Sequence, residues 1–534
     1  MQNHQQSDRL SWGDTVFLHM EREGMPLNVA SVCIFDGEIS RVDCIQFVES
    51  KLPLLPRYLK RVVAAPLGLG LPSWEYDPDF DLRRHIREET LKHGTELELK
   101  AIAGKLFGQV MDRNHPLWDM TLVHGLKENQ SAVIFRLHHC LADGIAGVGI
   151  LNLLLDASPA APRLPKKKIK FTVPPPRDTL TSLTGGVVDS YADLAQRILS
   201  AMADLLNMGE RAAMNGGQLF STNELSDLLP EITAFTERLR FNVKYEGPQK
   251  FAWVNIPLAE VKQVGHTFGA SVNDVILALV TASMRRYVEF HGDRVKGKLF
   301  RMMVPVNLRG KDRTTELGNR ISIIPVTVPL DIRDPKKLLH AVHRRTEFLK
   351  QAHAAEIVSL STGFIGMLPT GVQAVIGPLL SQLPITPFNL VCTNIPGPQF
   401  PLYLAGRKML RWYPYVPIGG EMAVNCAVLS YDGNIGFGFS GDVHAAPDLR
   451  RIEEFLKVSF AELCEAAGIS PPRKKASPKR KTTRVAARTK SKPALEPVTS
   501  VQLSVPLTVH VPPVEAVKAE PPLAGEESVL ATVA

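Results

Sequence analysis

Residues 138–144 read His138-His139-Cys140-Leu141-Ala142-Asp143-Gly144, an HHxxxDG motif that directly follows the apolar run Ser131–Leu137. The run predicts a β-strand, and because it is nearly continuous in apolar residues, we expect the strand to be buried on both faces. Successive side chains of a strand point to opposite faces, so only one of the two histidines can face a given cavity. The apolar residues 145–151 after the motif predict a packed helix.

The residue types of this motif suit proton transfer to and from a substrate. A neutral imidazole has an ordinary pKa of about 6.5, so near neutral pH it can take a proton from an alcohol or an amine. The group under attack must then be pre-activated, and a thioester meets this need because its thiol leaves readily and accepts the proton in turn. We interpret Asp143 as the residue that organises the turn after the strand, paired with a distant arginine.

Metal binding through His138, His139 and Asp143 is the competing interpretation of the motif. Adjacent histidines on a strand diverge, however, and the sequence contains no CxxC or HExxH ligand spacing. We therefore favour acid–base chemistry and assign no metal ligands.

Further motifs follow one another in order along the chain and resemble those of the bacterial wax ester synthase/acyl-CoA:diacylglycerol acyltransferases. This family belongs to the wider group of CoA-dependent acyltransferases and condensation domains that share HHxxxDG. The resemblance extends from Leu10 to Gly468. Besides the motif at 138–144, the matching segments are Leu10–Asp14, Phe17–Leu18, Pro72–His85, Pro116–Trp118, Ser271–Ala278, Pro305–Arg309, Leu317–Asn319, Asn394–Pro398 and Leu429–Gly433.

The resemblance implies an α/β protein with the two-lobed fold of the CoA-dependent acyltransferases. In this fold each lobe is a mixed sheet flanked by helices, and the active-site tunnel runs between the lobes. His139 is implied as the general base, open to the tunnel from the side of an alcohol acceptor, whereas His138 faces the other way and packs structurally. Asp143 is expected to hold the loop through a salt bridge to Arg309 of the second lobe, and Gly144 is expected to allow close approach of the backbone.

Other residues of the matching motifs are candidates for contacts with the substrates. Asn273 is implied as a polar contact near the developing oxyanion, and Asp274, Arg309 and Asn394 are further candidate members of the site. Cys140 occupies a variable position of the motif, so we interpret it as a packing residue rather than a nucleophile.

The substrates that the resemblance implies are a long-chain acyl-CoA and the hydroxyl of diacylglycerol or of a long-chain alcohol, which give triacylglycerol or wax ester. No metal or redox cofactor is implied, since CoA enters as part of the substrate. Two alternatives remain open. One is a condensation-type acyltransferase whose acyl donor is bound to a carrier protein, and the other is a catalytically silent scaffold on a lipid surface.

The composition predicts a soluble globular protein that is large enough for two lobes. Of its 534 residues, 45% are hydrophobic and 22% are charged. The N-terminus is polar and lacks the apolar core of a signal peptide, and the six cysteines are scattered, which suits reduced thiols. We therefore expect a cytoplasmic protein that associates peripherally with a membrane or a lipid body.

Composition divides the chain into four parts. We expect an N-terminal lobe with HHxxxDG at 1–165, a linker and amphipathic-helix region at 166–240, a C-terminal lobe at 241–469, and a disordered tail at 470–534. Ser271 or Asn273 is expected to open a helix that runs to Tyr287 in the C-terminal lobe.

The tail at 470–534 is basic and rich in proline. It holds 11 Lys and Arg against 5 Glu, so it carries +6 of the chain's net charge of +8. Because no aromatic residues interleave with the basic cluster, we favour attachment to anionic lipid over binding to nucleic acid.

Residues 357–406 contain no charged residue and no histidine. Seven prolines divide this stretch into segments shorter than the roughly 20 residues that a membrane-spanning helix needs. We interpret the stretch as core and a crossover between lobes, or as an apolar wall for an acyl chain.

Overall fold

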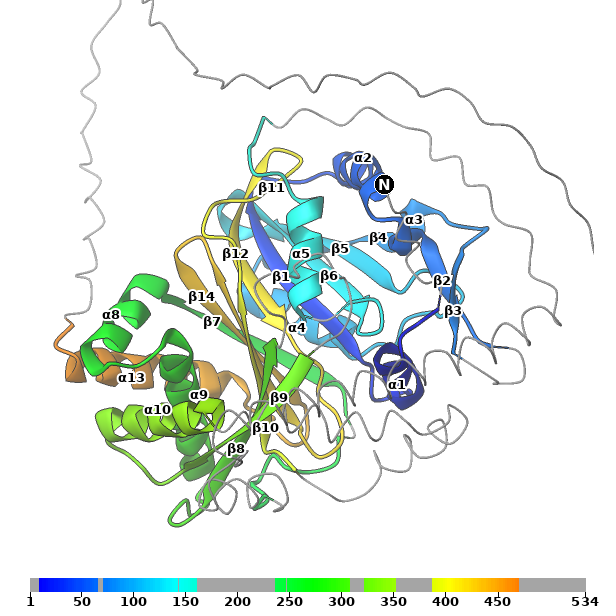
Figure 1. Ribbon diagram of the computed structural model, residues 1–534. Coiled ribbons are helices and arrows are strands. Elements are labelled where there is room, and N and C mark those ends of the chain that lie inside the picture. The colour runs from blue at the N-terminus through cyan, green and yellow to red at the C-terminus, as the bar shows by residue number, and fades with distance from the viewer. Residues whose placement is uncertain are drawn as a thin grey trace, which may run out of the picture. The chain divides into compact units, whose positions relative to one another are not determined.

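The computed structural model of the chain describes residues 9–65, 71–142, 144–160, 236–245, 247–307, 321–351 and 387–469. These residues form two lobes, each built on a six-stranded sheet (Figure 1). The first lobe contains α1 (Trp12–Met20), β1 (Asn28–Asp36), α2 (Arg41–Lys51), η1 (Leu52–Leu54), η2 (Pro56–Leu59), β2 (Lys60–Val63), β3 (Ser73–Tyr76), α3 (Leu82–His85), β4 (Ile86–Thr90), α4 (Glu96–Phe107), β5 (Trp118–Leu126), η4 (Lys127–Asn129), β6 (Gln130–His138) and α5 (Gly144–Leu154).

The remainder of the described chain builds the second lobe and returns two strands to the first. Its elements are β7 (Gln249–Pro257), α8 (Leu258–Phe268), α9 (Val272–Phe290), β8 (Leu299–Asn307), β9 (Ile321–Pro329), α10 (Pro335–Gln351), β10 (Leu390–Pro396), β11 (Tyr403–Leu404), β12 (Arg407–Tyr415), β13 (Val424–Tyr431), β14 (Asn434–Asp442) and α13 (Arg450–Ala466).

Both six-stranded sheets are mixed, which confirms the predicted α/β class. The first sheet has the order β11-β12-β1-β6-β5-β4, and β4 and β5 in it are parallel. The second has the order β7-β14-β13-β10-β8-β9, and in it β10 runs parallel to both β13 and β8. A separate hairpin, β2 with β3, extends from the first lobe.

The strand that precedes the motif is β6, in the middle of the first sheet. Its odd-numbered side chains, such as Phe135, join a core with α2 and α5. Its even-numbered side chains, such as Ile134, join a second core with Phe107 of α4 and Trp253 of β7. β6 is therefore buried on both faces, as its apolar sequence predicts. The charge within it, Arg136, is buried against Asp119 of β5, with 2.9 Å between Nε and Oδ1.

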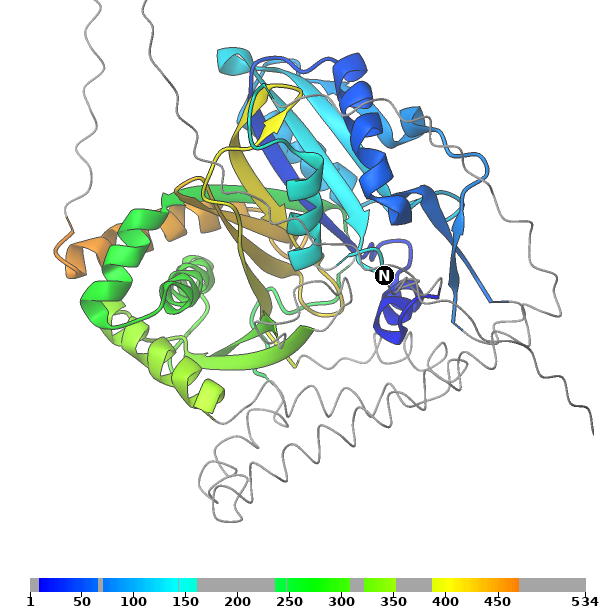
Figure 2. The ribbon, with the colours of Figure 1, turned by 45° about the horizontal axis from the view of Figure 1, so that its top comes forward.

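In the second lobe, helices α8, α9, α10 and α13 cover one face of the sheet and enclose its apolar core (Figure 2). Helix α9 begins after Ser271, whose Oγ accepts a hydrogen bond from the Asp274 N–H at 3.2 Å. The Asp274 carboxylate accepts in return from the Ser271 N–H at 2.9 Å, which completes a capping box. The start of this helix confirms the prediction at Ser271, and its end lies at Phe290 rather than at Tyr287.

The strands β11 and β12 do not belong to the lobe that we predicted for them from a division of the chain at residue 241. They belong to the first sheet, where β12 lies antiparallel to β1 with Tyr415 opposite Ala30. The expectation that 241–469 forms one continuous lobe therefore needs correction for residues 403–415. The uncharged stretch 357–406 suggested a crossover between lobes, but composition did not reveal that β12 pairs with β1, because the partner that β1 needs along its edge comes from far along the chain.

Helix α4 holds the two lobes together on the opposite side of the first sheet from α5. The Nζ of Lys100 lies 2.9 Å from a carboxylate oxygen of Glu453 on α13 and 4.7 Å from the ring centroid of Trp253. Gly104, one turn further on, lies so close to β7 that an added Cβ would stand 2.6 Å from the carbonyl oxygen of Gln249.

Several predicted features fall outside the described residues. They are Asp143, Arg309, residues 166–235 of the linker region, residues 357–386 of the uncharged stretch, and the tail at 470–534. Of the helices in the described ranges, none has by itself the length and apolar composition of a membrane span. The pair α8 and α9 passes that test together, with a bend of 100° between the two helices.

Candidate active site

The two histidines of the motif lie where β6 leaves the sheet between β1 and the segment before β5. The backbone N–H of His138 donates to the carbonyl of Leu117 at 2.9 Å. The backbone N–H of His139 donates to the carbonyl of Leu27 on the other side, also at 2.9 Å. These two bonds fix the direction in which each imidazole leaves the strand.

The imidazole of His138 is fully buried in a polar cluster. Its Nδ1 accepts a hydrogen bond from the Cys140 N–H at 3.1 Å, so in the neutral ring the proton is on Nε2. Nε2 lies 3.4 Å from Oε1 of Glu21, whose side chain is only 2% exposed. The Glu21 carboxylate also accepts from the Leu27 N–H at 3.0 Å and from the Arg113 guanidinium at 3.1 Å.

The charge state of Glu21 follows from these contacts. Burial acts to raise the pKa of the Glu21 carboxyl, but the hydrogen bond and the electrostatic interaction with His138, together with the bonds from Leu27 and Arg113, lower it below its ordinary value. The cluster is therefore an ionised carboxylate that holds the His138 ring in one orientation.

The imidazole of His139 is half-buried on the other side of the strand end. It stacks on Phe17 of α1, with 3.9 Å between the ring centroids and 16° between the ring planes. Its Nδ1 is buried and has no hydrogen-bond partner among the described residues. Burial, followed by the proximity of His138, lowers the pKa of His139 to about 4, while its own backbone carbonyl acts in the opposite direction. At neutral pH the ring is therefore neutral, which is the state that a general base requires.

Cys140 is buried, and burial raises the pKa of its thiol well above the ordinary value. A thiol that stays protonated is a poor nucleophile. The environment of Cys140 therefore suits the packing role that we expected from the sequence.

The structure brings two of the other candidates together. Asn394 on β10 donates from Nδ2 to Oδ1 of Asn273, in the first turn of α9, at 3.1 Å. Ile395, next to Asn394, packs against the core that contains Leu141 and Ala142 of the motif. The strand that carries Asn394 also contacts α5, the helix that directly follows the motif.

Asp274 has a different position from the one that its motif suggested. Its carboxylate is fully buried and accepts from Ser271 N–H, from the Thr346 hydroxyl at 2.6 Å and from His343 Nδ1 at 2.9 Å. These bonds lower the pKa of Asp274 although burial opposes them. With its oxygens engaged by α9 and α10, Asp274 caps one helix and anchors another instead of facing a substrate.

Of the remaining candidates, Gly144 is the first residue of α5, and the motif loop leads directly into that helix. Asp143 and Arg309 lie outside the described residues. Phe17, Glu21 and Arg113 belong to the site but were not identified as site residues from the sequence. Phe17 lies in a segment that matched the family, whereas Glu21 and Arg113 reach the motif only through the fold.

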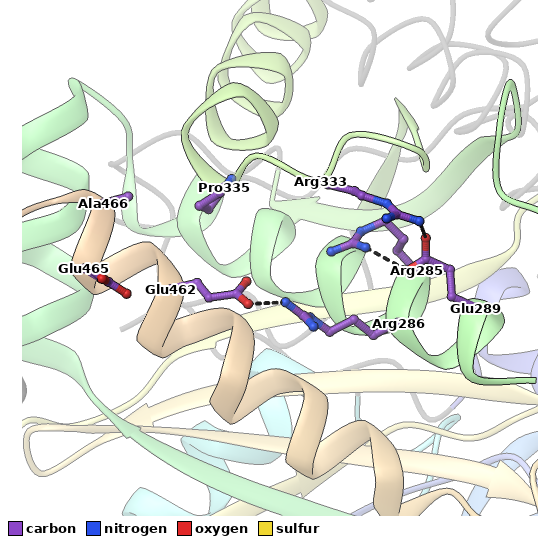
Figure 3. Close-up of a pocket in the computed structure, with 8 residues that line it drawn as sticks. All are labelled: Arg285, Arg286, Glu289, Arg333, Pro335, Glu462, Glu465 and Ala466. Atoms are coloured by element: carbon purple, nitrogen blue, oxygen red, sulfur yellow. Dashed lines mark hydrogen bonds and ion pairs between the residues drawn. The ribbon is translucent and has the colours of Figure 1, made fainter.

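A cavity of about 580 Å³ on the second lobe lies between α9, the start of α10 and the end of α13 (Figure 3). Three arginines line it, but each is paired: Arg285 and Arg333 with Glu289 at 2.8 Å, and Arg286 with Glu462. Its charges are therefore balanced, and none of its lining residues belongs to the motif. In the described ranges, no three His, Cys, Asp or Glu side chains are grouped so that they could hold a metal ion.

Comparison with known proteins identifies the same family over most of the chain. Residues 10–276 match the wax ester synthase/diacylglycerol acyltransferase catalytic domain, and residues 317–464 match the WS/DGAT C-terminal domain. A probable diacylglycerol O-acyltransferase of Mycobacterium tuberculosis is 29% identical over 439 residues, which cover 82% of this chain and 91% of that protein. Another from the same species is 26% identical over 472 residues, covering 86% of this chain and all of that protein.

Solved structures share the two-lobed fold. The wax ester synthase/diacylglycerol acyltransferase of Marinobacter aquaeolei superposes with a TM-score of 0.60 at 24% identity, over 86% of this chain and 100% of that one. The first condensation domain of the calcium-dependent antibiotic synthetase superposes with a TM-score of 0.54 at 14% identity, over 87% of this chain and 97% of that one. These likenesses establish the fold.

Proposed function

The chain belongs to the wax ester synthase/diacylglycerol acyltransferase family, and from this membership we propose that it moves a long-chain acyl group from acyl-CoA to the hydroxyl of diacylglycerol or of a long-chain alcohol. The observation that carries the proposal is the position and the protonation state of His139. It stands at the end of β6 in the family's motif, half-buried, neutral at pH 7 and stacked on an aromatic ring. Because the imidazole is neutral, it can accept a proton from a hydroxyl.

In the proposed reaction the acceptor oxygen attacks the thioester carbonyl carbon while His139 takes the hydroxyl proton. Since Nδ1 is buried, we assign Nε2 as the atom that receives the proton. The tetrahedral intermediate then breaks its C–S bond, the ester is released, and the departing thiolate takes the proton back from His139. The thioester supplies the activated acyl group, so we assign no metal and no redox cofactor to this step.

Residues around His139 position the reacting groups. His138, bound to Glu21, keeps the strand end in place and contributes no group to the substrate. The Asn394–Asn273 pair is the candidate donor set for the oxyanion, because amide N–H groups stabilise negative charge that develops on a carbonyl oxygen. A salt bridge between Asp143 and Arg309 remains part of the proposal as the link that holds the motif loop.

Both acceptors and both products are insoluble in water, so we further propose that the protein works at a membrane or lipid-body surface in the cytoplasm. The basic cluster of the tail would contribute about 1 kcal/mol for each Lys or Arg near anionic lipid. Co-sedimentation with anionic vesicles, for the full chain and for a chain that ends at Gly468, tests this role. Equal binding of the two chains would contradict it.

The proposed reaction is tested by measuring thiol release from palmitoyl-CoA with diacylglycerol and with hexadecanol as acceptors. We expect release that depends on an acceptor, and a loss of about 10² to 10⁴ in His139→Ala. The control is His266→Ala, which removes an exposed histidine of α8. An active His139→Ala would contradict the assignment of the base. Wild-type protein that releases thiol with neither acceptor would contradict the proposed function, and an acyl-carrier-protein donor would then be tested.

A further inference from the structure

The cavity of about 580 Å³ between α9, the start of α10 and the end of α13 contains no residue of the motif, and the proposed reaction does not use it (Figure 3). Three arginines and three glutamates line it, so its formal charges cancel. These charges are unevenly distributed, however, because Glu465 is exposed and makes no ion pair with any described residue. The remaining part of the cavity holds three guanidinium groups against two carboxylates.

The two carboxylates are shared among the three arginines. Oε2 of Glu289 accepts from Nη1 of Arg285 at 2.8 Å, and Oε1 of the same carboxylate accepts from Nη2 of Arg333, also at 2.8 Å. The carboxylate of Glu462 accepts from Arg286. Glu289 therefore serves two guanidinium groups, and this side of the cavity keeps an excess of positive charge.

Arg285 has one edge of its guanidinium group unused. The residue lies in the last two turns of α9 and is only 5% exposed. Its Nη1 binds Glu289, but neither Nε nor Nη2 makes a hydrogen bond to any described residue, and Nε is buried. With the same Nε–Nη2 edge, Arg136 binds both carboxylate oxygens of Asp119. A buried donor without an acceptor is unfavourable, so the open edge of Arg285 favours a ligand that supplies acceptor oxygens.

The pKa of Arg285 supports the same conclusion. Burial lowers the pKa of its guanidinium group below the ordinary value, and although the Glu289 carboxylate acts against this, the nearby guanidinium groups of Arg286 and Arg333 add to it. The carboxylates of the cavity therefore do not fully compensate the buried positive charge. An anion bound beside Arg285 would compensate it.

The three guanidinium groups reach the cavity from different directions (Figure 3). Arg285 and Arg286 are consecutive on α9, so their side chains leave the helix about 100° apart, and Arg333 enters from the segment before α10. Donors arranged in this way suit the tetrahedral phosphate group, whose oxygens also point in several directions, better than a planar carboxylate. The volume of the cavity lies in the range of small-ligand pockets, so there is room for the substituent of a phosphate ester.

We propose that this cavity on the second lobe binds a phosphate group, with the Nε–Nη2 edge of Arg285 and the guanidinium groups of Arg286 and Arg333 as its donors. The inference goes beyond the proposed acyl transfer and does not depend on it. A phosphate group bound there links α9 to the segment that begins α10. The same two helices are joined near the start of α9 by the contacts of Asp274. The ligand therefore strengthens the packing of α9 against α10.

Equilibrium dialysis with radiolabelled inorganic phosphate, at an ionic strength held constant with NaCl, measures the dissociation constant for the full chain. In Arg285→Lys, which keeps the charge but loses the planar edge, we expect this constant to rise by about tenfold. Arg333→Gln should also raise it, by about threefold to tenfold, and because this side chain is 75% exposed, the change leaves the buried packing intact. The matched control is Arg344→Gln, an exposed arginine of α10 that does not line the cavity and should leave the constant unchanged.

A dissociation constant that is unchanged in both Arg285→Lys and Arg333→Gln would overturn the site, as would wild-type protein that binds no phosphate. An equal rise in Arg344→Gln would also overturn it, because the effect would then come from net charge alone.

Two competitors distinguish the sources of the phosphate group, namely glycerol phosphate, which is a soluble ester, and the short-chain lipid dihexanoyl phosphatidic acid. Stronger displacement of the labelled phosphate by the lipid assigns the site to a phospholipid head group. Equal or stronger displacement by glycerol phosphate assigns it to a soluble phosphate ester, and displacement by neither assigns it to inorganic phosphate itself.

Discussion

The imidazole of His139 lies nearly parallel to the phenyl ring of Phe17, with 3.9 Å between the two ring centroids. The phenyl ring covers one face of the imidazole and keeps water away from it. Burial is the largest cause of the lowered pKa of His139, and Phe17 of α1 contributes to that burial.

The first prediction concerns the pH dependence of catalysis. A base must be unprotonated to act, and the pKa of His139 is lowered to about 4. We therefore expect kcat/KM to stay level from pH 8 down to the region of pH 5 and to fall only as the pH approaches 4. A pH series of kcat/KM with palmitoyl-CoA measures this decrease, the acid limb of the pH profile. Far-ultraviolet circular dichroism at each pH monitors folding. A midpoint near 6.5, the ordinary value for histidine, would contradict the lowered pKa of His139.

The second prediction concerns Phe17→Ala. Loss of the phenyl ring admits water to the face of His139, so the pKa of His139 should rise toward its ordinary value. The acid limb of kcat/KM should accordingly move to higher pH than in the wild type. Phe290→Ala, which removes an exposed phenyl ring on α9, serves as the control and should leave the limb in place. If the acid limb of kcat/KM has the same midpoint in Phe17→Ala as in the wild type, the stacking on Phe17 does not lower the pKa of His139.

The third prediction concerns Glu21→Gln. The change removes a buried charge from His138 and Arg113, and we expect it to lower the free energy of unfolding by about 2 kcal/mol at pH 7. Because the folded pKa of Glu21 is lowered, its stabilisation is fully present above the ordinary carboxyl pKa and is lost as the pH falls through the lowered value. The difference from the wild type should therefore be larger at pH 7 than at pH 3.

Urea unfolding at the two pH values measures the effect of Glu21→Gln. Glu49→Gln, an exposed carboxyl of α2, is the control and should change the free energy of unfolding by less than about 0.5 kcal/mol. If Glu21→Gln lowers the free energy of unfolding by the same amount at pH 7 and at pH 3, the effect comes from altered packing of the side chain and not from loss of its charge.

The fourth prediction uses a pair of glycines inside helices. An added Cβ at Gly104 would lie 2.6 Å from the Gln249 carbonyl oxygen and 3.2 Å from the Lys250 Cα, both in the backbone of β7. Gly104→Ala should therefore destabilise the protein by about 1 to 3 kcal/mol, although alanine is the better helix former. At Gly149 in α5 an added Cβ meets nothing within 4 Å, so Gly149→Ala should stabilise by about 0.5 to 1 kcal/mol. Thermal unfolding of the two variants tests whether they shift in opposite directions.

The sequence was sufficient where the determining interactions are local. The apolar run predicted β6, the motif placed its two histidines at the strand end, and the apolar residues after Gly144 predicted α5. The capping box of α9 can also be predicted from the sequence, because Ser271 and Asp274 have the spacing of such a box. Our assignment of Asp274 to substrate contact disregarded that signal.

The sequence was not sufficient where distant segments meet. Glu21 contacts both His138 and Arg113 only because the end of α1, the end of β6 and the segment before β5 converge. The place of β12 beside β1 likewise depends on a pairing between residues 28–36 and 407–415, for which neither segment carries a local signal.

The position of β12 also has a consequence for how the protein is made. A growing chain leaves the ribosome from its N-terminus, so β1, β6, β5 and β4 emerge long before residues 407–415, which complete their sheet. Until then β1 presents an unpaired edge with apolar side chains on both faces, the kind of surface that aggregates. Translation of nearly the whole described chain must therefore precede completion of the lobe that bears the catalytic motif, and the edge of β1 stays open to pairing with other chains until then.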